Sequence, residues 1–167
     1  MAAPTSAALE EFNALPEAEA RERLTRCLAV PRWVDSVVAG RPYADREALL
    51  TVAETAATLS DDELQEALAG HPRIGERAGA GHDAAFSERE QSGVDRQDAD
   101  VAARLAAGNR AYEERFDRVF LIRAAGRDAT EILAELERRL GNDDDTERTE
   151  TEEQLRQIAL LRLEQLT

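Results

Sequence analysis

The 167-residue sequence contains no lysine, one cysteine and two histidines. Without lysine the protein cannot form a Schiff base, anchor pyridoxal phosphate or build a P-loop. Cys27 cannot form a disulfide within the chain, which fits a reducing compartment, and its apolar surroundings favour a buried structural thiol. One cysteine and two histidines cannot make a cysteine–histidine zinc cage, and no HExxH spacing occurs, so we expect no metal site.

Long apolar runs and excess positive charge are also lacking. No run approaches the length of a membrane span and the N-terminus does not resemble a signal peptide, so we expect a cytoplasmic protein that does not bind membranes. The 21 basic residues, all arginine, are outnumbered by 35 acidic ones, which gives a formal net charge of -14. Such a chain repels phosphate backbones, so we expect no nucleic-acid partner.

The residues that are abundant indicate helices. The hydrophobic class makes up 43% and the charged class 34%, a soluble globular composition, and alanine, leucine, glutamate and arginine are strong helix formers. We expect an all-α, single-domain bundle over residues 1–167, with about eight or nine helices and a long central loop after His71. A short apolar run at 119–122 is expected to be extended and buried, and Asn142–Thr149 to be an acidic connector before a last helix near Glu150. Start signals predict further helices after Pro16, Pro31, Asp45, Ser60 and Asp128, and near Ser87 and Asp98.

A histidine–proline pair begins the predicted loop. The run from Gly70 to Gly75 reads Gly-His-Pro-Arg-Ile-Gly, with His71 just past a helix C-terminus. Proline restricts its own backbone and that of the preceding residue, so His71 lies on a stiffened main chain. Imidazole suits proton transfer near neutral pH, which makes His71 a candidate acid or base. The same position also suits a histidine that only interacts with the last carbonyls of the preceding helix.

The second candidate is the run Ser87-Glu88-Arg89-Glu90-Gln91. Ser87 and Glu90 match a capping box, in which each side chain accepts a hydrogen bond from a backbone N–H at the helix start. Free N–H groups at the same helix start also suit an anion or a carbonyl, with Ser87 and Gln91 as polar contacts. The two roles are compatible.

The third candidate is Arg162 in the last predicted helix. Four residues at helical spacing share one face of it: Leu155, Ala159, Arg162 and Leu166. Arg162 is therefore expected in the middle of an apolar stripe, where a buried charge needs a partner. That partner is either an internal carboxylate or a ligand carboxylate, whose geometry a guanidinium fork fits.

Together these motifs resemble the OHCU (2-oxo-4-hydroxy-4-carboxy-5-ureidoimidazoline) decarboxylase family of urate catabolism. The resemblance extends over nearly the whole chain in the right order. Its further segments are Phe12-Asn13-Ala14-Leu15-Pro16, Arg41-Pro42-Tyr43, Asn109-x-x-Tyr112-x-x-x-Phe116, Gly126-Arg127 and Leu161-Arg162-Leu163.

The resemblance implies a cofactor-independent, mostly helical enzyme, a homodimer, that decarboxylates a small anionic substrate to (S)-allantoin. It implies His71 as the catalytic acid/base and Glu90 as its acidic companion, with no metal. The residues that it implies for substrate binding are Pro72, Ser87, Glu88, Arg89, Gln91, Phe120, Leu121, Ile122, Arg123, Ala124 and Arg162.

One segment departs from the family pattern. Where the family commonly reads Phe-Gly-Phe-Pro-Phe, this chain has Phe116-Asp117-Arg118-Val119-Phe120, without the glycine and the proline. Two other functions stay open at this point. One is a non-catalytic helical interaction or regulatory module with the same fold, in which His71 and Arg162 are structural. The other is an isomerase or hydratase that acts on a related heterocycle without releasing CO2.

Overall fold

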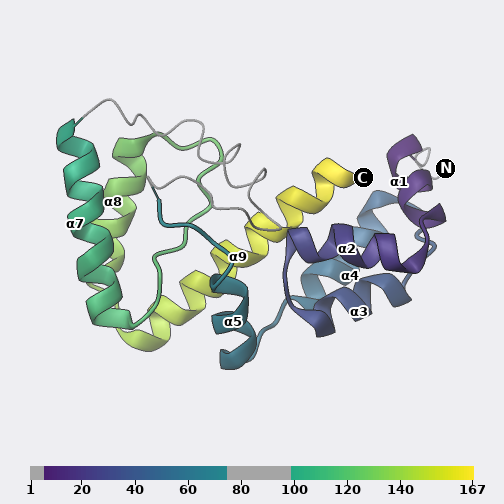
Figure 1. Ribbon diagram of the computed structural model, residues 1–167, viewed down its shortest axis with the longest axis horizontal. Coiled ribbons are helices and arrows are strands. Elements are labelled where there is room, and N and C mark those ends of the chain that lie inside the picture. Colours follow the sequence, from purple (N-terminus) through teal and green to yellow (C-terminus); the bar gives the residue numbers. More distant parts are fainter. Residues whose placement is uncertain (1–5, 75–98) are drawn as a thin grey trace. The chain divides into compact units, whose positions relative to one another are not determined.

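The computed structural model describes residues 6–74 and 99–167, and every regular element in these two stretches is a helix (Figure 1). This confirms the all-α class. The helix expected near Ser87, and the predicted loop beyond Ile74, lie outside the described residues. The eight helices of the described stretches are α1 (Ala7–Ala14), α2 (Glu17–Cys27), α3 (Pro31–Ala39), α4 (Arg46–Ala56), α5 (Asp61–Leu68), α7 (Ala99–Phe116), α8 (Ala129–Arg139) and α9 (Asp144–Leu166).

The chain forms two compact units. One combines residues up to Ala67 with Arg156–Thr167, and the other is Leu68–Leu155, so α9 contributes to both. The expectation of one domain over residues 1–167 stays a prediction. Within the part of the chain that the structure describes, no helix is long and apolar enough to cross a membrane.

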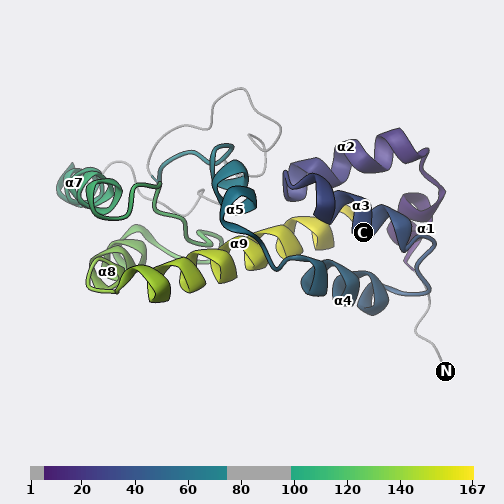
Figure 2. The same ribbon diagram turned by 90° about the horizontal axis from the view of Figure 1, so that it is seen from below.

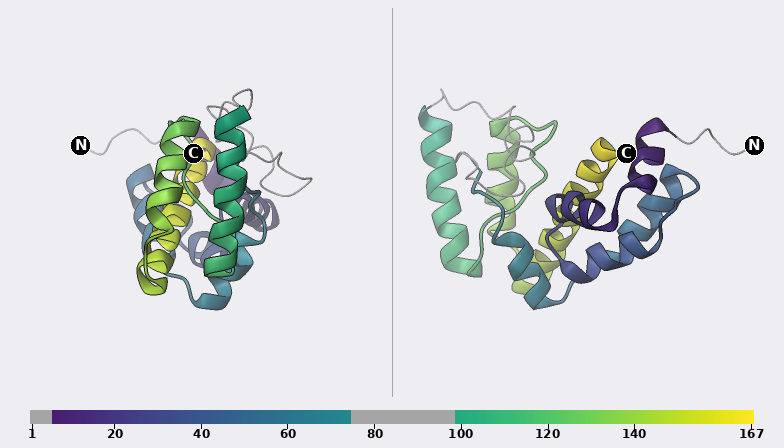
Figure 3. Two further views of the ribbon diagram at one scale, coloured as in Figure 1. Left: turned by 90° about the vertical axis from the view of Figure 1, so that its left-hand side faces the viewer. Right: turned by 45° about the vertical axis from the view of Figure 1, so that its right-hand side comes forward.

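Capping residues and apolar faces build the first unit. The Asp45 side chain accepts a hydrogen bond from Ala48 N at the start of α4, and α3 begins at Pro31, as the start signals predict. Trp33 is fully buried, and its indole N–H donates to Ala53 O at 2.9 Å, which joins α3 to α4. Figure 3 (right) shows the ribbons of this unit from a further side. Our sequence reasoning did not identify α1, which begins after a Ser6 cap.

In the second unit, α7 and α8 lie side by side (Figures 1 and 2). A Cβ atom at Gly108 of α7 would lie 2.6 Å from Leu136 Cδ2 of α8, so glycine is what allows this close approach. The Tyr112 ring packs on Phe116 and Phe120, with ring centroids 4.7 and 5.2 Å apart. These side chains belong to one buried cluster that also includes aliphatic residues of α8.

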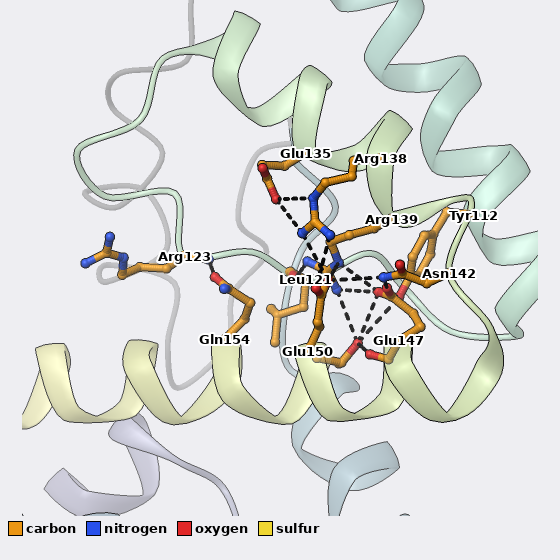
Figure 4. Close-up of polar contacts among 11 residues, drawn as sticks. Tyr112, Leu121, Arg123, Glu135, Arg138, Arg139, Asn142, Glu147, Glu150 and Gln154 are labelled. Atoms are coloured by element: carbon orange, nitrogen blue, oxygen red, sulfur yellow. Dashed lines mark hydrogen bonds and ion pairs between the residues drawn. The ribbon is translucent and has the colours of Figure 1, made fainter.

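A buried ion pair lies beside this cluster. Arg139 at the end of α8 is 1% exposed and Glu147 of α9 is 0% exposed. Arg139 Nε donates to Glu147 Oε1 at 2.9 Å, and the Tyr112 hydroxyl of α7 donates to the same oxygen (Figure 4). Asn142 donates to the other carboxylate oxygen at 3.0 Å. Burial opposes ionisation of Glu147, but the bonds from Arg139 and Tyr112 outweigh it and keep the pKa of that carboxyl below its ordinary value.

The structure corrects the predicted connector. Helix α9 begins at Asp144 rather than near Glu150, so most of Asn142–Thr149 is helical. Asp143 caps the helix by accepting from Thr146 N at 2.7 Å. The first turn of α9 is rich in acidic residues, which we interpreted as a solvated connector. Acidic residues are also favourable at this place, because the N-terminus of a helix carries the positive end of the helix dipole.

Asp117 stands where the family commonly has glycine, and it has a left-handed backbone, with φ of 54°. Its N–H donates to Glu113 O at 2.9 Å, so it terminates α7 in the conformation that glycine most often provides. Aspartate tolerates this conformation better than most residues, which explains how the turn forms without glycine.

We expect Asp117→Gly to raise the free energy of unfolding by up to about 1 kcal/mol, because glycine adopts a positive φ without steric cost. Asp117→Ala should lower it, since alanine lacks that freedom. Urea denaturation followed by circular dichroism measures both. A glycine variant less stable than the wild type would contradict this account of the turn.

The buried network also predicts alkaline sensitivity. Burial, together with the bond to the Glu147 carboxylate, raises the pKa of Tyr112 from 10.0 to about 12. An unfolded tyrosine ionises first, so the stability that Tyr112 contributes is fully present below pH 10.0 and is lost as pH rises towards about 12. The melting temperature of Tyr112→Phe should therefore fall less steeply over this interval. Tyr43, whose pKa burial also raises, contributes in both proteins and cancels in the comparison. Equal slopes would refute the assignment to Tyr112.

Candidate functional site

The candidate base His71 lies on a short segment fixed to α7. Its own N–H donates to Leu68 O at 3.0 Å, just past the end of α5, and both His71 and Pro72 are half-buried. Arg73 Nη2 donates to Glu113 Oε2 of α7 at 3.0 Å. The Ile74 carbonyl accepts from the buried Asn109 side chain of α7 at 3.2 Å. Residues 71–74 are thus non-helical yet attached to α7 at two successive positions.

The predicted wall segment 120–124 is also outside the helices. Phe120, Leu121, Ile122 and Ala124 are buried and Arg123 is half-buried, which confirms the expected burial of the apolar run except at Val119, which is half-buried. The segment follows the Asp117 turn and leads into the cap of α8, where Asp128 accepts from Glu131 N at 2.8 Å. Its main chain is bonded by side chains of α8 and α9: Arg139 Nη1 donates to Leu121 O at 2.7 Å, and Arg123 N–H donates to Gln154 Oε1 at 2.9 Å (Figure 4).

These two segments share one core. Ile74 belongs to the same buried cluster as Phe120, Ile122 and Ala124, around Tyr112 of α7. The structure therefore brings the main chain that carries His71 and Pro72 onto the same support as the predicted substrate wall.

Arg162 belongs to the other unit, and the structure buries it as the helical spacing predicts. It is 1% exposed and lies on α9 among Ile158, Ala159 and Leu163, all buried. Arg162 Nη1 donates to the Arg26 carbonyl, close to the end of α2, at 3.3 Å. A desolvated guanidinium held from the main chain keeps its fork geometry, which suits a carboxylate.

The remaining predicted residues, Ser87, Glu88, Arg89, Glu90 and Gln91, lie outside the described residues, and their roles stay predictions. Within residues 6–74 and 99–167, no group of three or more His, Cys, Asp or Glu side chains is arranged to hold a metal ion. A surface hollow of about 400 Å³ in the first unit contains none of the predicted site residues. Its lining is Asn13, Glu17, Arg21, Asp35, Val38, Ala39, Arg41 and Pro42.

Sequence reasoning missed Arg139, Glu147 and Gln154, although one signal was available. Ile132, Leu136 and Arg139 follow the same helical spacing that places Arg162 in an apolar stripe, so Arg139 was equally open to that argument. Its carboxylate partner was hidden, because Glu147 lies in the stretch interpreted as a connector. Nothing in the local sequence marks Gln154, whose contact is with the main chain of a distant segment.

The chain resembles known proteins over most of its length. The family model described as OHCU decarboxylase matches residues 13–164. A 2-oxo-4-hydroxy-4-carboxy-5-ureidoimidazoline decarboxylase from Amia calva is 33% identical over 135 residues, covering 78% of this chain and 77% of the relative. The uric acid degradation bifunctional protein of Bacillus sp. (strain TB-90) is 25% identical over 160 residues. That match covers 95% of this chain, which spans only 32% of the relative.

Solved structures show the same fold. An OHCU decarboxylase crystallised in the presence of (S)-allantoin matches with a TM-score of 0.73 at 20% identity, covering 87% of this chain and 96% of that one. An (S)-allantoin synthase matches with a TM-score of 0.70 at 17% identity, covering 95% of this chain and 53% of that one. The fold, the His71 motif and the family match over residues 13–164 lead to one conclusion: the chain belongs to the OHCU decarboxylase family, a family of carboxy-lyases.

Proposed function

We propose that the protein decarboxylates OHCU to (S)-allantoin in urate catabolism, without a cofactor and with His71 as the acid/base. The observation that carries the proposal is the attachment of the His71 segment and residues 120–124 to one buried core, in a chain of this family. The relative from Amia calva carries the name of this activity.

The chemistry requires a place for an electron pair. Loss of CO2 leaves two electrons on carbon, and this chain has no lysine with which to delocalise them through an imine. The substrate ring, with a carbonyl and an imine-type nitrogen next to the reacting carbon, supplies the electron sink. His71 transfers the proton: it acts either on the hydroxyl group during CO2 loss or on carbon afterwards. A positioned acid/base of this kind contributes on the order of 100- to 10,000-fold.

The other residues bind and orient the substrate. Phe120, Leu121 and Ile122 are buried and apolar, and a dry wall of this kind favours loss of a carboxylate charge. Arg162 binds an anionic group through its fork. Glu90 orients the imidazole or holds the ureido group, and the remaining substrate contacts come from Pro72, Ser87, Glu88, Arg89, Gln91, Arg123 and Ala124.

We also propose that the protein is a homodimer in the cytoplasm. Leu160 and Leu161 of α9 are only half-buried within the chain, which leaves apolar surface for a second copy.

We expect His71→Ala to abolish enzymatic formation of (S)-allantoin from freshly generated OHCU, because the acid/base is removed. Chiral analysis of the product measures this, since spontaneous decay of the substrate gives no stereochemical preference. The matched control is His82→Ala, which removes the other histidine and should leave activity unchanged. Near-native turnover of His71→Ala, with an unchanged helical circular dichroism signal, would refute the role of His71.

The same assay separates the other functions. A non-catalytic module would not accelerate the disappearance of OHCU above its spontaneous decay. An isomerase or hydratase would consume a heterocyclic substrate without releasing CO2.

We expect Arg162→Lys to lower kcat/KM on the order of tenfold to 100-fold, because lysine keeps the charge but loses the fork. The control is Arg148→Lys, at an α9 arginine whose bond to Glu152 at 2.8 Å an ammonium can replace. Steady-state kinetics with melting temperatures measures both variants. If Arg162→Lys is fully active, the arginine is structural and does not bind substrate.

A further inference from the structure

Two side chains bond to the main chain of residues 120–124. Arg139 Nη1 donates to Leu121 O at 2.7 Å and Gln154 Oε1 accepts from Arg123 N–H at 2.9 Å. The two bonds engage the main chain at residues two positions apart, one at a carbonyl group and one at an N–H. Figure 4 shows the two side chains reaching the segment from α8 and α9.

These bonds replace what a neighbouring strand would supply. The segment is buried, no strand occurs among the described residues, and a buried peptide group without a partner is costly. Arg139 and Gln154 therefore determine where the main chain of the wall lies, and the apolar side chains fill the space around it.

The two anchors differ in rigidity. Arg139 is itself fixed: it bonds Glu147, donates to Thr151 Oγ1 at 3.2 Å and lies over the Phe120 ring, with Cζ 4.6 Å from the centroid. Gln154 is half-buried, and its bond to Arg123 N–H can be removed with little disturbance of the core. The pair thus offers one severe test and one mild test of the same idea.

We propose that Arg139 and Gln154 are positioning residues for substrate, which act through the main chain of residues 120–124 without touching the reacting atoms. The proposal rests on the proposed function, in which this segment is the wall of the OHCU site. A wall displaced by a fraction of an ångström binds and orients the substrate less well, and small misplacements carry large kinetic costs.

The mild test uses Gln154→Leu, which removes the acceptor at similar size, and Gln154→Glu, which keeps an acceptor at the same place. The control is Thr149→Val, at an exposed α9 residue whose hydroxyl bonds only to Asp145 O of its own helix among the contacts seen here. Steady-state kinetics on OHCU, the pH profile of kcat/KM, and amide hydrogen exchange of peptides covering residues 118–125 are measured for each protein.

We expect Gln154→Leu to lower kcat/KM about tenfold, mostly through a higher KM, and to speed exchange in 120–124. The pH profile should not move, because His71 is unchanged. Gln154→Glu should restore both values to near those of the wild type. Unchanged exchange in 120–124 overturns the proposal, and so does faster exchange with unchanged kcat/KM, which would make the role merely structural.

The severe test is Arg139→Lys, which keeps a charge for Glu147 but removes the Nη1 bond to Leu121 O. Its control is Arg138→Lys, at an exposed neighbour that pairs with Glu135 and Glu150. Arg139→Lys should reproduce the kinetic and exchange changes, and a variant with wild-type values for both overturns the proposal. If Arg139→Lys does not fold, the Gln154 series decides. Failure of the wild type to convert OHCU would refute the proposed function instead, and exchange alone would then decide the anchoring.

Discussion

The packing of the second compact unit depends on the buried Arg139–Glu147 ion pair. Desolvating two charges costs more than their attraction returns unless the remaining polar atoms are also bonded. That requirement brings three helices together, because Tyr112 of α7, Arg139 of α8 and Glu147 of α9 converge on one carboxylate. The same guanidinium bonds the Leu121 carbonyl, so the wall segment is placed by the group that joins the helices.

This arrangement links stability to the candidate site. The Phe120 ring contacts both the Arg139 guanidinium and the Tyr112 ring, and Ile74, three residues after His71, packs in the same cluster. In this acidic chain arginine is the only strong cation, and one of the arginines, Arg139, has a structural role in the core. Arg162, buried on α9, is reserved in our proposal for the substrate.

Local signals predicted most of the fold. Asp45, Ser60 and Asp128 cap helices as expected, since a cap depends on only a few adjacent residues. The start of α9 was mistaken because acidic residues are typical both of a solvated connector and of a helix N-terminus, and the sequence alone does not separate them. Of the site, His71 and residues 120–124 came from a motif, and the burial of Arg162 from periodicity. The roles of Gln154 and Glu147 were not predicted, because their partners Arg123 and Arg139 belong to other elements of the fold.

The division of α9 between the two units bears on the order in which the protein is made. Residues 68–155 are contiguous, so that unit is complete once Leu155 has emerged from the ribosome. The unit that begins first is finished last, since it needs residues 156–167. Until then Ser6 and the Arg26 carbonyl lack their hydrogen-bond partners Thr167 and Arg162 in the last part of the chain. Within this chain the helices of that unit are thus exposed longer to chaperones and to neighbouring chains than those of residues 68–155, and the final turns of α9, with Arg162 among them, end that exposure.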